Sequence, residues 1–543
     1  MGSALFYSRG FMNEYFGVMD QIVLAVYFVC TMGIGVFFWR KSQSTEGFTA
    51  ASRSLPGWVC GLSIFATYLS SISFLALPGK AFVANWNSFV FSLSLPLATW
   101  IAVKWFLPYY RKSGEVSAYA NLERRFGPWA RTYAGTFYLL TQIARMGTVM
   151  YLMALPMNIL LGWKLSTVIL VTGVSVTAYA FVGGLVAVIW ADALQAMVLT
   201  AGAIVCVVVM LAGLPEGPQQ VFTIAAEQQK FSLGSFEPSV LESTFWLVLV
   251  YGLFINLQNF GIDQSYVQRY VASKSGREAR KSVWLGGLIY VPVSALFFFI
   301  GTTLFAYYHT HPADLNEVKT IVARQALQKE GLSVTDPAYT TALEEKQATL
   351  TDRDIGDKVF PHFIGAKLPQ GLTGLLIAAV FAAAMSTVST SLNSSATLIM
   401  TDFYQRYIKP QATEQQRMRV LHSATIVWGV LGTATALCLT RVESALDTWW
   451  MLASIFSGGI VGLFLLGMMS KQASNAGAAT GVCLGALAIC WMVLSQQAWW
   501  PESLAHLKNP MHSYMTIVVG TLTILLTGLA VTQLSKLVKG RPS

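Results

Sequence analysis

Long apolar runs separated by short polar connections form the pattern of the whole chain. Each run is close to the length of about 20 residues that a helix needs to cross a bilayer, and each has few or no charged residues. The pattern predicts thirteen membrane-spanning helices. They cover residues 20 to 39, 57 to 77, 88 to 107, 134 to 156, 165 to 184, 187 to 213, 244 to 261, 283 to 308, 371 to 401, 421 to 440, 446 to 469, 475 to 496 and 514 to 534.

The composition supports this interpretation. Of the 543 residues, 54% are hydrophobic and 11% are charged, and the mean hydropathy is +0.54. An ordinary soluble domain has about 25% charged residues. We therefore expect an all-α polytopic protein whose residues 1 to 543 form a single unit in a lipid bilayer.

Basic residues are concentrated in every second connection, and cytoplasmic loops are the ones that retain Lys and Arg. This alternation predicts an outer amino terminus, a cytoplasmic carboxyl terminus and an outer loop over residues 309 to 370. It also accounts for the net charge of +10 without any nucleic-acid partner. The basic segments are RKSQSTEGFTAASR, YYRKSGEVSAYANLERRFGPWAR, VQRYVASKSGREARK, DFYQRYIKPQATEQQRMR and KLVKGRPS.

Enzyme chemistry is not indicated by the sequence. The six histidines show no H-E-x-x-H pair and no Cys-x-x-Cys partner, and GREARKS lacks the glycine before the lysine of a phosphate-binding loop. Only residues 535 to 543 follow the last span, which leaves no room for a signalling domain. We expect a transporter or channel without a cofactor and without an obligate protein partner.

The segment AAAMSTVSTSLNSSATL, residues 382 to 398, places hydroxyl and amide groups at membrane depth. Ser386, Ser389, Thr390 and Asn393 have the spacing of one helical face. Such groups are costly in a bilayer and commonly line a cavity, and hydroxyl and carbonyl oxygens suit an alkali cation. Helix packing with hydroxyls bonded to their own backbone is the alternative interpretation.

Two spans have features of interrupted helices. ATYLSSISFLALPG, residues 66 to 79, contains several serines and a Pro-Gly pair, and YGLFINLQNFG, residues 251 to 261, contains glycine and three amides. The second segment comes five spans after the first, and this odd offset means that the two cross the membrane in opposite directions. Interrupted helices in inverted, corresponding positions indicate the binding site of a secondary transporter.

Arg145 is the one charged residue between Arg131 and Lys164. A lone guanidinium inside a span costs a few kcal/mol on insertion scales. One explanation is an ion pair with Asp192, the only acidic residue well inside a predicted span. We favour the other, that Arg145 binds an anionic substrate.

Five motifs together resemble the sodium:solute symporter family over nearly the whole chain, and within it most closely the bacterial sialic acid (N-acetylneuraminate) symporters. The resemblance implies sodium-coupled uptake of a carboxylate-bearing sugar across the bacterial inner membrane. The motifs are SRSLPGW (52 to 58), FATYLSSISF (65 to 74), GGLVAVIWADALQ (183 to 195), QSYVQRY (264 to 270) and FAAAMSTVSTSLN (381 to 393).

The resemblance also implies a fold, the leucine-transporter-like 5+5 inverted repeat. The first repeat is expected over residues 57 to 261, reaching into the first span of the second repeat, which covers residues 244 to 469. One extra helix, residues 20 to 39, precedes the repeats, and two helices within residues 475 to 534 follow them.

Sodium ligands are implied residue by residue. The main sodium site of the family falls on Ala66, Leu69, Ala383, Ser386 and Thr387. A second sodium site, present in some sialic acid symporters, falls on Asp192, Ser386, Ser389 and Thr390.

The implied substrate site matches the family less completely. Arg145 stands where the family binds the substrate carboxylate, and Ser70 and Ser73 keep the hydroxyls of the interrupted helix. Tyr68 replaces a usual threonine, and Ser88 and Ser92 replace an expected aromatic residue and glutamine. Another acidic sugar or a monocarboxylate therefore stays open as the substrate, a neutral sugar is disfavoured by Arg145, and a channel or sensor is the alternative class.

Overall fold

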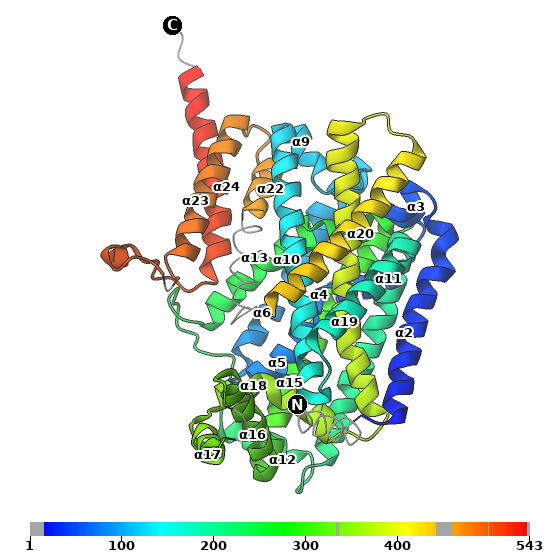
Figure 1. Cartoon of the computed structure of the whole chain (residues 1–543). Coiled ribbons are helices and arrows are strands. Elements are labelled where there is room, and N and C mark those ends of the chain that lie inside the picture. The colour runs from blue at the N-terminus through cyan, green and yellow to red at the C-terminus, as the bar shows by residue number, and fades with distance from the viewer. Residues whose placement is uncertain (1–15, 333–335, 441–458, 498, 540–543) are drawn as a thin grey trace.

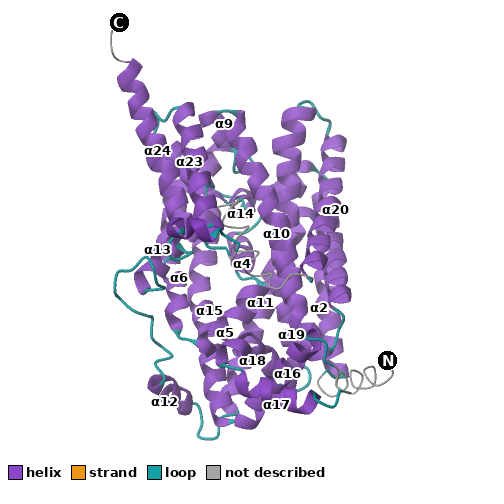
Figure 2. Cartoon of the chain, turned by 60° about the vertical axis from the view of Figure 1, so that its left-hand side comes forward, coloured by secondary structure: helices purple, strands orange, loops and turns teal. Residues whose placement is uncertain are grey.

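The computed structural model describes residues 16 to 332, 336 to 440, 459 to 497 and 499 to 539. These residues form helices joined by short connections, and Figure 2 shows no strand among them. The all-helical architecture agrees with the predicted fold class. Because a helix satisfies its backbone hydrogen bonds within one segment, it is the element that apolar runs in a bilayer should form.

The helices have the following bounds. The α-helices are α2 (Val18–Phe38), α3 (Thr45–Ala50), α4 (Gly57–Tyr68), α5 (Ser71–Val83), α6 (Val90–Leu93), α7 (Leu95–Ile101), α8 (Leu107–Ser113), α9 (Ala120–Phe126), α10 (Pro128–Leu161), α11 (Leu165–Ala212), α12 (Gln219–Glu227), α13 (Phe245–Ile262), α14 (Gln264–Ala272), α15 (Gly276–Thr310), α16 (Pro312–Lys329), α17 (Tyr339–Thr349), α18 (Asp352–Ala366), α19 (Leu372–Leu398), α20 (Glu414–Leu439), α22 (Ile460–Met469), α23 (Asn475–Leu494) and α24 (Met515–Lys539). Shorter 3-10 or π segments are η1 (Trp39–Ser42), η2 (Ala51–Arg53), η3 (Trp86–Phe89), η4 (Ala102–Phe106), η5 (Ile399–Ile408) and η6 (Glu502–Leu507).

The number of membrane spans differs from the predicted thirteen. Within the described residues, nine helices are long and apolar enough to cross a bilayer, or ten if the bent pair α4 and α5 counts as one span. One of the nine, α11, has 48 residues and a non-helical Gly184 with φ of 52°. The chain leaves helical geometry at Gly184, so residues 165 to 183 and 185 to 212 are two helices that meet at a kink, beside the boundary between the spans predicted over 165 to 184 and 187 to 213. Two of the predicted spans are therefore merged in this count, and part of the span predicted over 446 to 469 lies outside the described residues.

Of the two predicted helix interruptions, the first lies within the predicted segment 66 to 79, whereas the second does not lie within 251 to 261. In the first, Leu69 and Ser70 are extended between α4 and α5, whereas Pro78 lies inside α5. In the second, α13 continues through the whole segment 251 to 261, and the extended residue is Asp263 before α14. Of the amides expected to interrupt this helix, Asn256 instead donates to Ser94 Oγ at 2.9 Å.

The helix α19 lies at the centre of the bundle. It packs against α11, α10, α4 and the extra amino-terminal helix α2, and every residue from 376 to 398 is buried. Asp20 of α2 is fully buried, and its Oδ1 accepts bonds of 2.7 Å from the N–H groups of both Gly371 and Gly374. The extra helix therefore fixes the first turn of α19.

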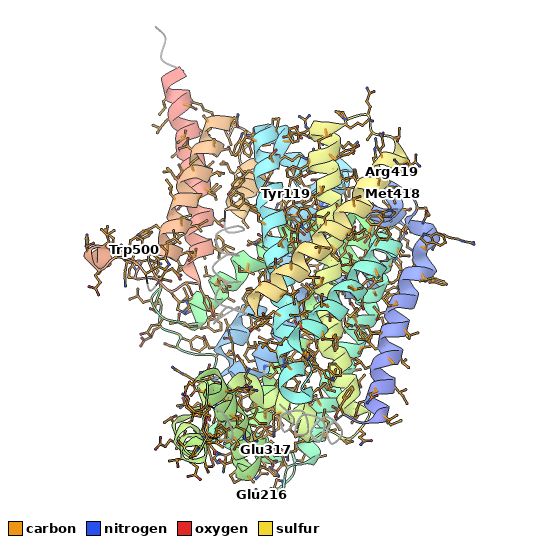
Figure 3. The ribbon with its side chains drawn as sticks, in the orientation of Figure 1. Tyr119, Glu216, Glu317, Met418, Arg419 and Trp500 are labelled. Carbon is orange, nitrogen blue, oxygen red and sulfur yellow. The ribbon has the colours of Figure 1, made fainter. Side chains whose placement is uncertain are left out.

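Connections predicted on one side of the membrane gather at one end of the molecule. Figure 1 shows α12, α16, α17 and α18 together at the lower end, with α3 and α9 near the upper end. Figure 3 places Glu216 and Glu317 at the lower end and Arg419 at the upper end. This separation matches the alternation of basic connections in the sequence.

Candidate ion and substrate site

The interruption between α4 and α5 frees backbone carbonyls beside α19. The N–H of Ser73, which would bond to Leu69 in a continuous helix, bonds instead to Ser70 Oγ at 3.5 Å. The carbonyl of Ala66 accepts a bond of 3.1 Å from Ser386 Oγ of α19. The sequence segment of closely spaced serines thus produces a local break with carbonyl oxygens facing another helix.

Four of the five residues predicted for the main sodium site are joined by hydrogen bonds. Ser386 Oγ bonds to the carbonyls of both Ala66 and Ala383, and Thr387 Oγ1 bonds to that of Ala383 at 3.2 Å. The fifth residue, Leu69, lies at the break itself. These carbonyl and hydroxyl oxygens are the donor type that an alkali cation prefers.

The packing interpretation of the same segment also holds in part. Ser394 and Thr397 donate to carbonyls four residues earlier at 2.8 Å, and their hydroxyls accept bonds of 2.8 Å from Tyr138 and Gln268 of other helices. Ser391 Oγ instead bonds to Gln142 Oε1 of α10 at 2.6 Å. The polar segment therefore combines oxygen donors near the break with side chains that fix α19 to its neighbours.

Asp192 lies at the centre of the predicted second ion site. Its Oδ2 accepts bonds from Ser63 Oγ at 2.6 Å and Thr390 Oγ1 at 3.4 Å. Its Oδ1 is buried and has no hydrogen-bond partner among the described residues. Ser389 Oγ bonds to the Ser386 carbonyl at 3.1 Å, so Ser389 connects the two predicted ion sites along α19.

Arg269 is a central residue of this site that the sequence reasoning missed. Its Nη2 lies 2.7 Å from Asp192 Oδ2 and 2.6 Å from Thr390 Oγ1, and its side chain is 1% exposed. We counted it among the basic residues of the connection VQRYVASKSGREARK, whereas it is buried in α14. Its position within the motif QSYVQRY was the available signal.

Arg145 is not the partner of Asp192. It is half-buried on α10, and its Nη2 donates at 3.0 Å to the carbonyl of Thr67, two residues before the break at Leu69. Thr67 Oγ1 in turn lies 3.2 Å from Thr390 Oγ1. Thr67 therefore connects the candidate substrate arginine to the cluster around Asp192.

Tyr68 belongs to a cluster of aromatic and polar side chains beside the break. Its ring centroid lies 4.3 Å from that of Tyr290, and its hydroxyl donates to Asn256 Oδ1. The Asn256 amide nitrogen donates to Ser94 Oγ at 2.9 Å. Tyr68, which replaces a smaller residue of the family, thus fixes the end of α4 to α13 and to the segment before α7.

The remaining predicted substrate residues do not form one group. Ser70 and Ser73 lie together at the start of α5. Ser92 is buried, and its hydroxyl oxygen lies 2.8 Å from the hydroxyl oxygen of Ser294 in α15. Ser88 lies farther along the chain in η3, where it lines a separate cavity at the end of α5. The structure thus brings Ser70 and Ser73 to the break and places Ser88 apart from them.

Comparison with solved structures identifies the fold. The chain superimposes on a substrate-bound outward-open state of a Na+-coupled sialic acid symporter with a TM-score of 0.82, 26% identity and coverage of 95% of this chain and 98% of that chain. The nucleobase-cation-symport-1 family transporter Mhp1, in a closed conformation, gives a TM-score of 0.51 at 15% identity, covering 90% and 94% of the two chains. The protein therefore has the architecture of a leucine-transporter-like secondary transporter.

The sequence comparison gives the family. Residues 48–485 match the model of the sodium:solute symporter family, and the chain belongs to this family. Relatives include the sodium/sialic acid symporter NanT of Aliivibrio fischeri, 30% identical over 88% of each chain, and SiaT of Proteus mirabilis, 29% identical over 87% of this chain and 89% of SiaT. Human sodium-coupled monocarboxylate transporter 1 is 25% identical over 90% of this chain and 75% of its own length.

Proposed function

We propose that this protein takes up a carboxylate-bearing sugar, N-acetylneuraminate in the first place, by sodium-coupled alternating access. The observation that supports this most directly is the half-buried Arg145, whose guanidinium bonds to the backbone of Thr67, two residues before the break at Leu69, and carries no ion pair among the described residues. Relatives named as sodium/sialic acid symporters support the substrate.

Arg145 is proposed to bind the substrate carboxylate. A guanidinium offers a planar pair of N–H donors that matches a carboxylate through two charge-assisted bonds. Ser70 and Ser73, at the start of α5, supply hydroxyls for the sugar, and Tyr68 limits the space beside them. Ser92 and Ser88 are assigned supporting positions, because Ser92 is bonded to Ser294 and Ser88 lines a separate cavity.

Sodium is proposed to bind where the freed carbonyls of α4 meet α19. Ala66, Leu69, Ala383, Ser386 and Thr387 would supply the main site, and Asp192, Ser386, Ser389 and Thr390 the second. The unpartnered, buried Oδ1 of Asp192 is the observation that supports the second site, because a buried carboxylate oxygen without a donor is costly unless a cation or proton compensates it.

The two interrupted helices suggest how binding is coupled to movement. Sodium at the main site would join α4 to α19, and substrate at Arg145 would join the break to α10. The half-helices α5 and α14 lie beyond the two breaks and contact α15. Their reorientation about Leu69, Ser70 and Asp263 would open the site to one side of the membrane at a time.

A monocarboxylate is the second candidate substrate. Several relatives that are 24–26% identical are named sodium-coupled monocarboxylate transporters. Such a substrate would use the same guanidinium but fewer hydroxyl contacts. The two candidates differ in whether Ser70 and Ser73 are needed for affinity.

The finer features of the topology are proposals as well. We infer a bacterial inner-membrane location, an outer amino terminus and a cytoplasmic carboxyl terminus from the distribution of Lys and Arg. The repeats would cover 57 to 261 and 244 to 469, with the extra helices at 20 to 39 and within 475 to 534 and the outer loop at 309 to 370. The protein would act without an enzyme cofactor or an obligate protein partner.

Uptake into liposomes tests the proposal. Purified protein should accumulate labelled N-acetylneuraminate only when sodium is higher outside than inside. The ligand set of hydroxyls and carbonyls gives no reason for proton coupling, so a pH gradient in sodium-free buffer should not drive uptake. Pyruvate and a neutral hexose, tested as competitors, separate the sugar acid from the alternatives. Equal uptake under a pH gradient alone would disprove sodium coupling.

A further inference from the structure

A cavity of about 420 Å³ lies at the end of α5 that faces away from the break, and the site described above does not use it. This volume is within the range of about 300 to 1,000 Å³ that is typical of small-molecule sites. We name it the α18 cavity. Its lining residues are Gly79, Lys80, Val83, Ala84, Asn85, Asn87, Ser88, Ser243, Arg353, Gly356 and Asp357.

Two glycines allow the walls of the α18 cavity to meet. A Cβ at Gly79 of α5 would lie 2.9 Å from the carbonyl oxygen of Gly356 in α18 and 2.8 Å from Asp357 Oδ1. A Cβ at Gly356 would lie 3.3 Å from the Gly79 carbonyl oxygen. Backbone therefore packs on backbone at this point, and this contact positions the first turns of α18 against the outer half of the interrupted helix.

The three charged residues that line the cavity have a net positive charge. Lys80 from α5 and Arg353 from α18 face one carboxylate, that of Asp357. Arg353 is exposed and forms no ion pair within the described part of the chain. A guanidinium without a protein partner beside a lysine is suited to bind a carboxylate from solution.

The cavity also contains groups suited to hydroxyls. Asn85 and Ser88 offer an amide and a hydroxyl at its inner wall. Two other polar residues are engaged with the protein, because Asn87 donates to the Leu233 carbonyl at 2.9 Å and accepts from Ser243 Oγ at 2.8 Å. These two bonds fix the wall and leave Ser88 as the hydroxyl nearest to a ligand's hydroxyl groups.

The cavity is aligned with the central site along one helix. Ser73 and Lys80 are seven residues apart in α5, so they lie on the same helical face. The distance along the axis is about 10 Å at 1.5 Å per residue. One face of α5 therefore carries both the cavity residue Lys80 and Ser73 at the break.

We propose that the α18 cavity is a second, outer binding site for the carboxylate-bearing substrate, which Arg353 and Lys80 attract before it reaches Arg145. The proposal rests on the proposed function, because the ligand is the transported sugar acid. It assigns Ser88 to this outer site. Asp357 opposes an anion, so it lowers the affinity of the outer site and favours release toward the break.

Transport kinetics test the roles of Arg353 and Asp357, because removing a positive and a negative charge should change the KM in opposite directions. Arg353→Gln should raise the KM for N-acetylneuraminate uptake about threefold with kcat unchanged, as expected for an exposed charge contact. Asp357→Asn should lower the KM about twofold. Arg324→Gln, an equally exposed arginine in α16 outside the cavity, serves as the matched control and should leave the KM unchanged. The Arg353→Gln effect should diminish as choline chloride is added, because salt screens exposed charges.

Ligand-observed NMR tests binding apart from transport. The Arg145→Ala protein, in detergent without sodium, should give a saturation-transfer signal from N-acetylneuraminate that reports on the outer site. Adding Arg353→Gln to this protein should reduce the signal at least about twofold, and adding Arg324→Gln should not.

Each outcome has a definite meaning. Equal signals with and without Arg353→Gln, or KM values that rise for both Arg353→Gln and Asp357→Asn, would overturn the outer site while leaving the proposed function intact. If the wild-type protein neither binds nor transports N-acetylneuraminate, the proposed function fails and this inference fails with it.

Discussion

The carboxylate of Asp192 pairs with Arg269, whose Nη2 lies 2.7 Å from its Oδ2, and both side chains are almost completely buried. The pair joins α11 to α14, the half-helix that follows the second break. Arg269 also donates to Ser63 Oγ at 2.7 Å, so the pair is fixed to α4, which precedes the first break. A single ion pair therefore connects both interrupted helices to the centre of the bundle.

Removal of Arg269 should be severe. Arg269→Ala leaves the Asp192 carboxylate buried without its cation, which typically costs about 3 to 5 kcal/mol. We expect a large loss of thermal stability and yield in detergent. Arg124→Ala is the matched control, because Arg124 pairs with Glu115 at the exposed surface and such pairs contribute about 0 to 1 kcal/mol. Similar stability of the two variants would contradict the role given to Arg269.

The two proposed sodium sites should respond differently to substitution. Thr387→Ala should abolish sodium-driven uptake, because it removes a hydroxyl from the main site. Ser389→Ala should lower the Hill coefficient for sodium from about two towards one, since that coefficient is limited by the number of coupled ions. Ser395→Ala, whose buried hydroxyl has no hydrogen-bond partner among the described residues, is the control. An unchanged Hill coefficient in Ser389→Ala would mean that one sodium ion is coupled.

Hydropathy was sufficient to predict the fold class, because lipid requires long apolar helices and short polar connections. It also placed the boundary between two spans beside Gly184, where the backbone leaves helical geometry, but the count of thirteen spans is not reached among the described residues. The first break lies within the predicted segment 66 to 79, whereas the second was misassigned. Pro78 is accommodated inside α5, and the second break is at Asp263 instead of among the amides of α13.

The individual residues of the site were predicted better than the contacts between them. The hydroxyls of α19 and the carbonyl of Ala66 could be inferred from motifs, and the structure joins them. The pairing of Asp192 could not, because Arg269 stands just before a connection rich in lysine and arginine and is indistinguishable from a loop residue by hydropathy. Which buried cation meets a buried acid depends on how distant helices pack.

Acid should destabilise the outer helices through His362. This residue is 3% exposed on α18; its Nδ1 lies 2.7 Å from the Tyr308 hydroxyl, and its Nε2 lies 3.5 Å from Glu317 Oε2. Figure 3 shows Glu317 at the lower end of the molecule. Burial lowers the pKa of His362 below its ordinary value of 6.5, although Glu317 and Asp314 oppose this effect and Lys367 adds to it.

The direction in which stability changes with pH follows from the difference between the pKa of His362 in the folded and unfolded states. Because the folded-state pKa of His362 is depressed, the unfolded chain binds more protons below pH 6.5, and stability falls as the pH falls towards the folded-state pKa. Thermal unfolding measured from pH 7.5 to 5 should show a lower Tm at acid pH. His362→Gln should have a smaller pH dependence than the wild type. An equal decrease in both proteins would assign the effect to other groups.

Arg145 gives the sharpest test of the substrate class, because its two possible roles can be separated. Truncating one member of a buried charged pair typically costs about 2 to 5 kcal/mol, so Arg145→Ala should weaken the affinity for N-acetylneuraminate at least about tenfold. Arg145→Lys should restore it only in part, since lysine lacks the planar fork. Affinity is measured by sodium-dependent thermal shift and by the KM for uptake.

Arg145→Gln separates a substrate role from a structural one. Glutamine keeps an N–H donor for the Thr67 carbonyl, which Arg145 contacts at 3.0 Å, but it carries no charge. If Arg145 only fixes the end of α4, Arg145→Gln should transport the sugar acid as the wild type does. If Arg145 binds the carboxylate, Arg145→Gln should be as impaired as Arg145→Ala, while sodium alone still stabilises both variants because the proposed sodium ligands lie on α4, α11 and α19. Wild-type affinity in Arg145→Gln would therefore remove the main chemical support for an acidic substrate.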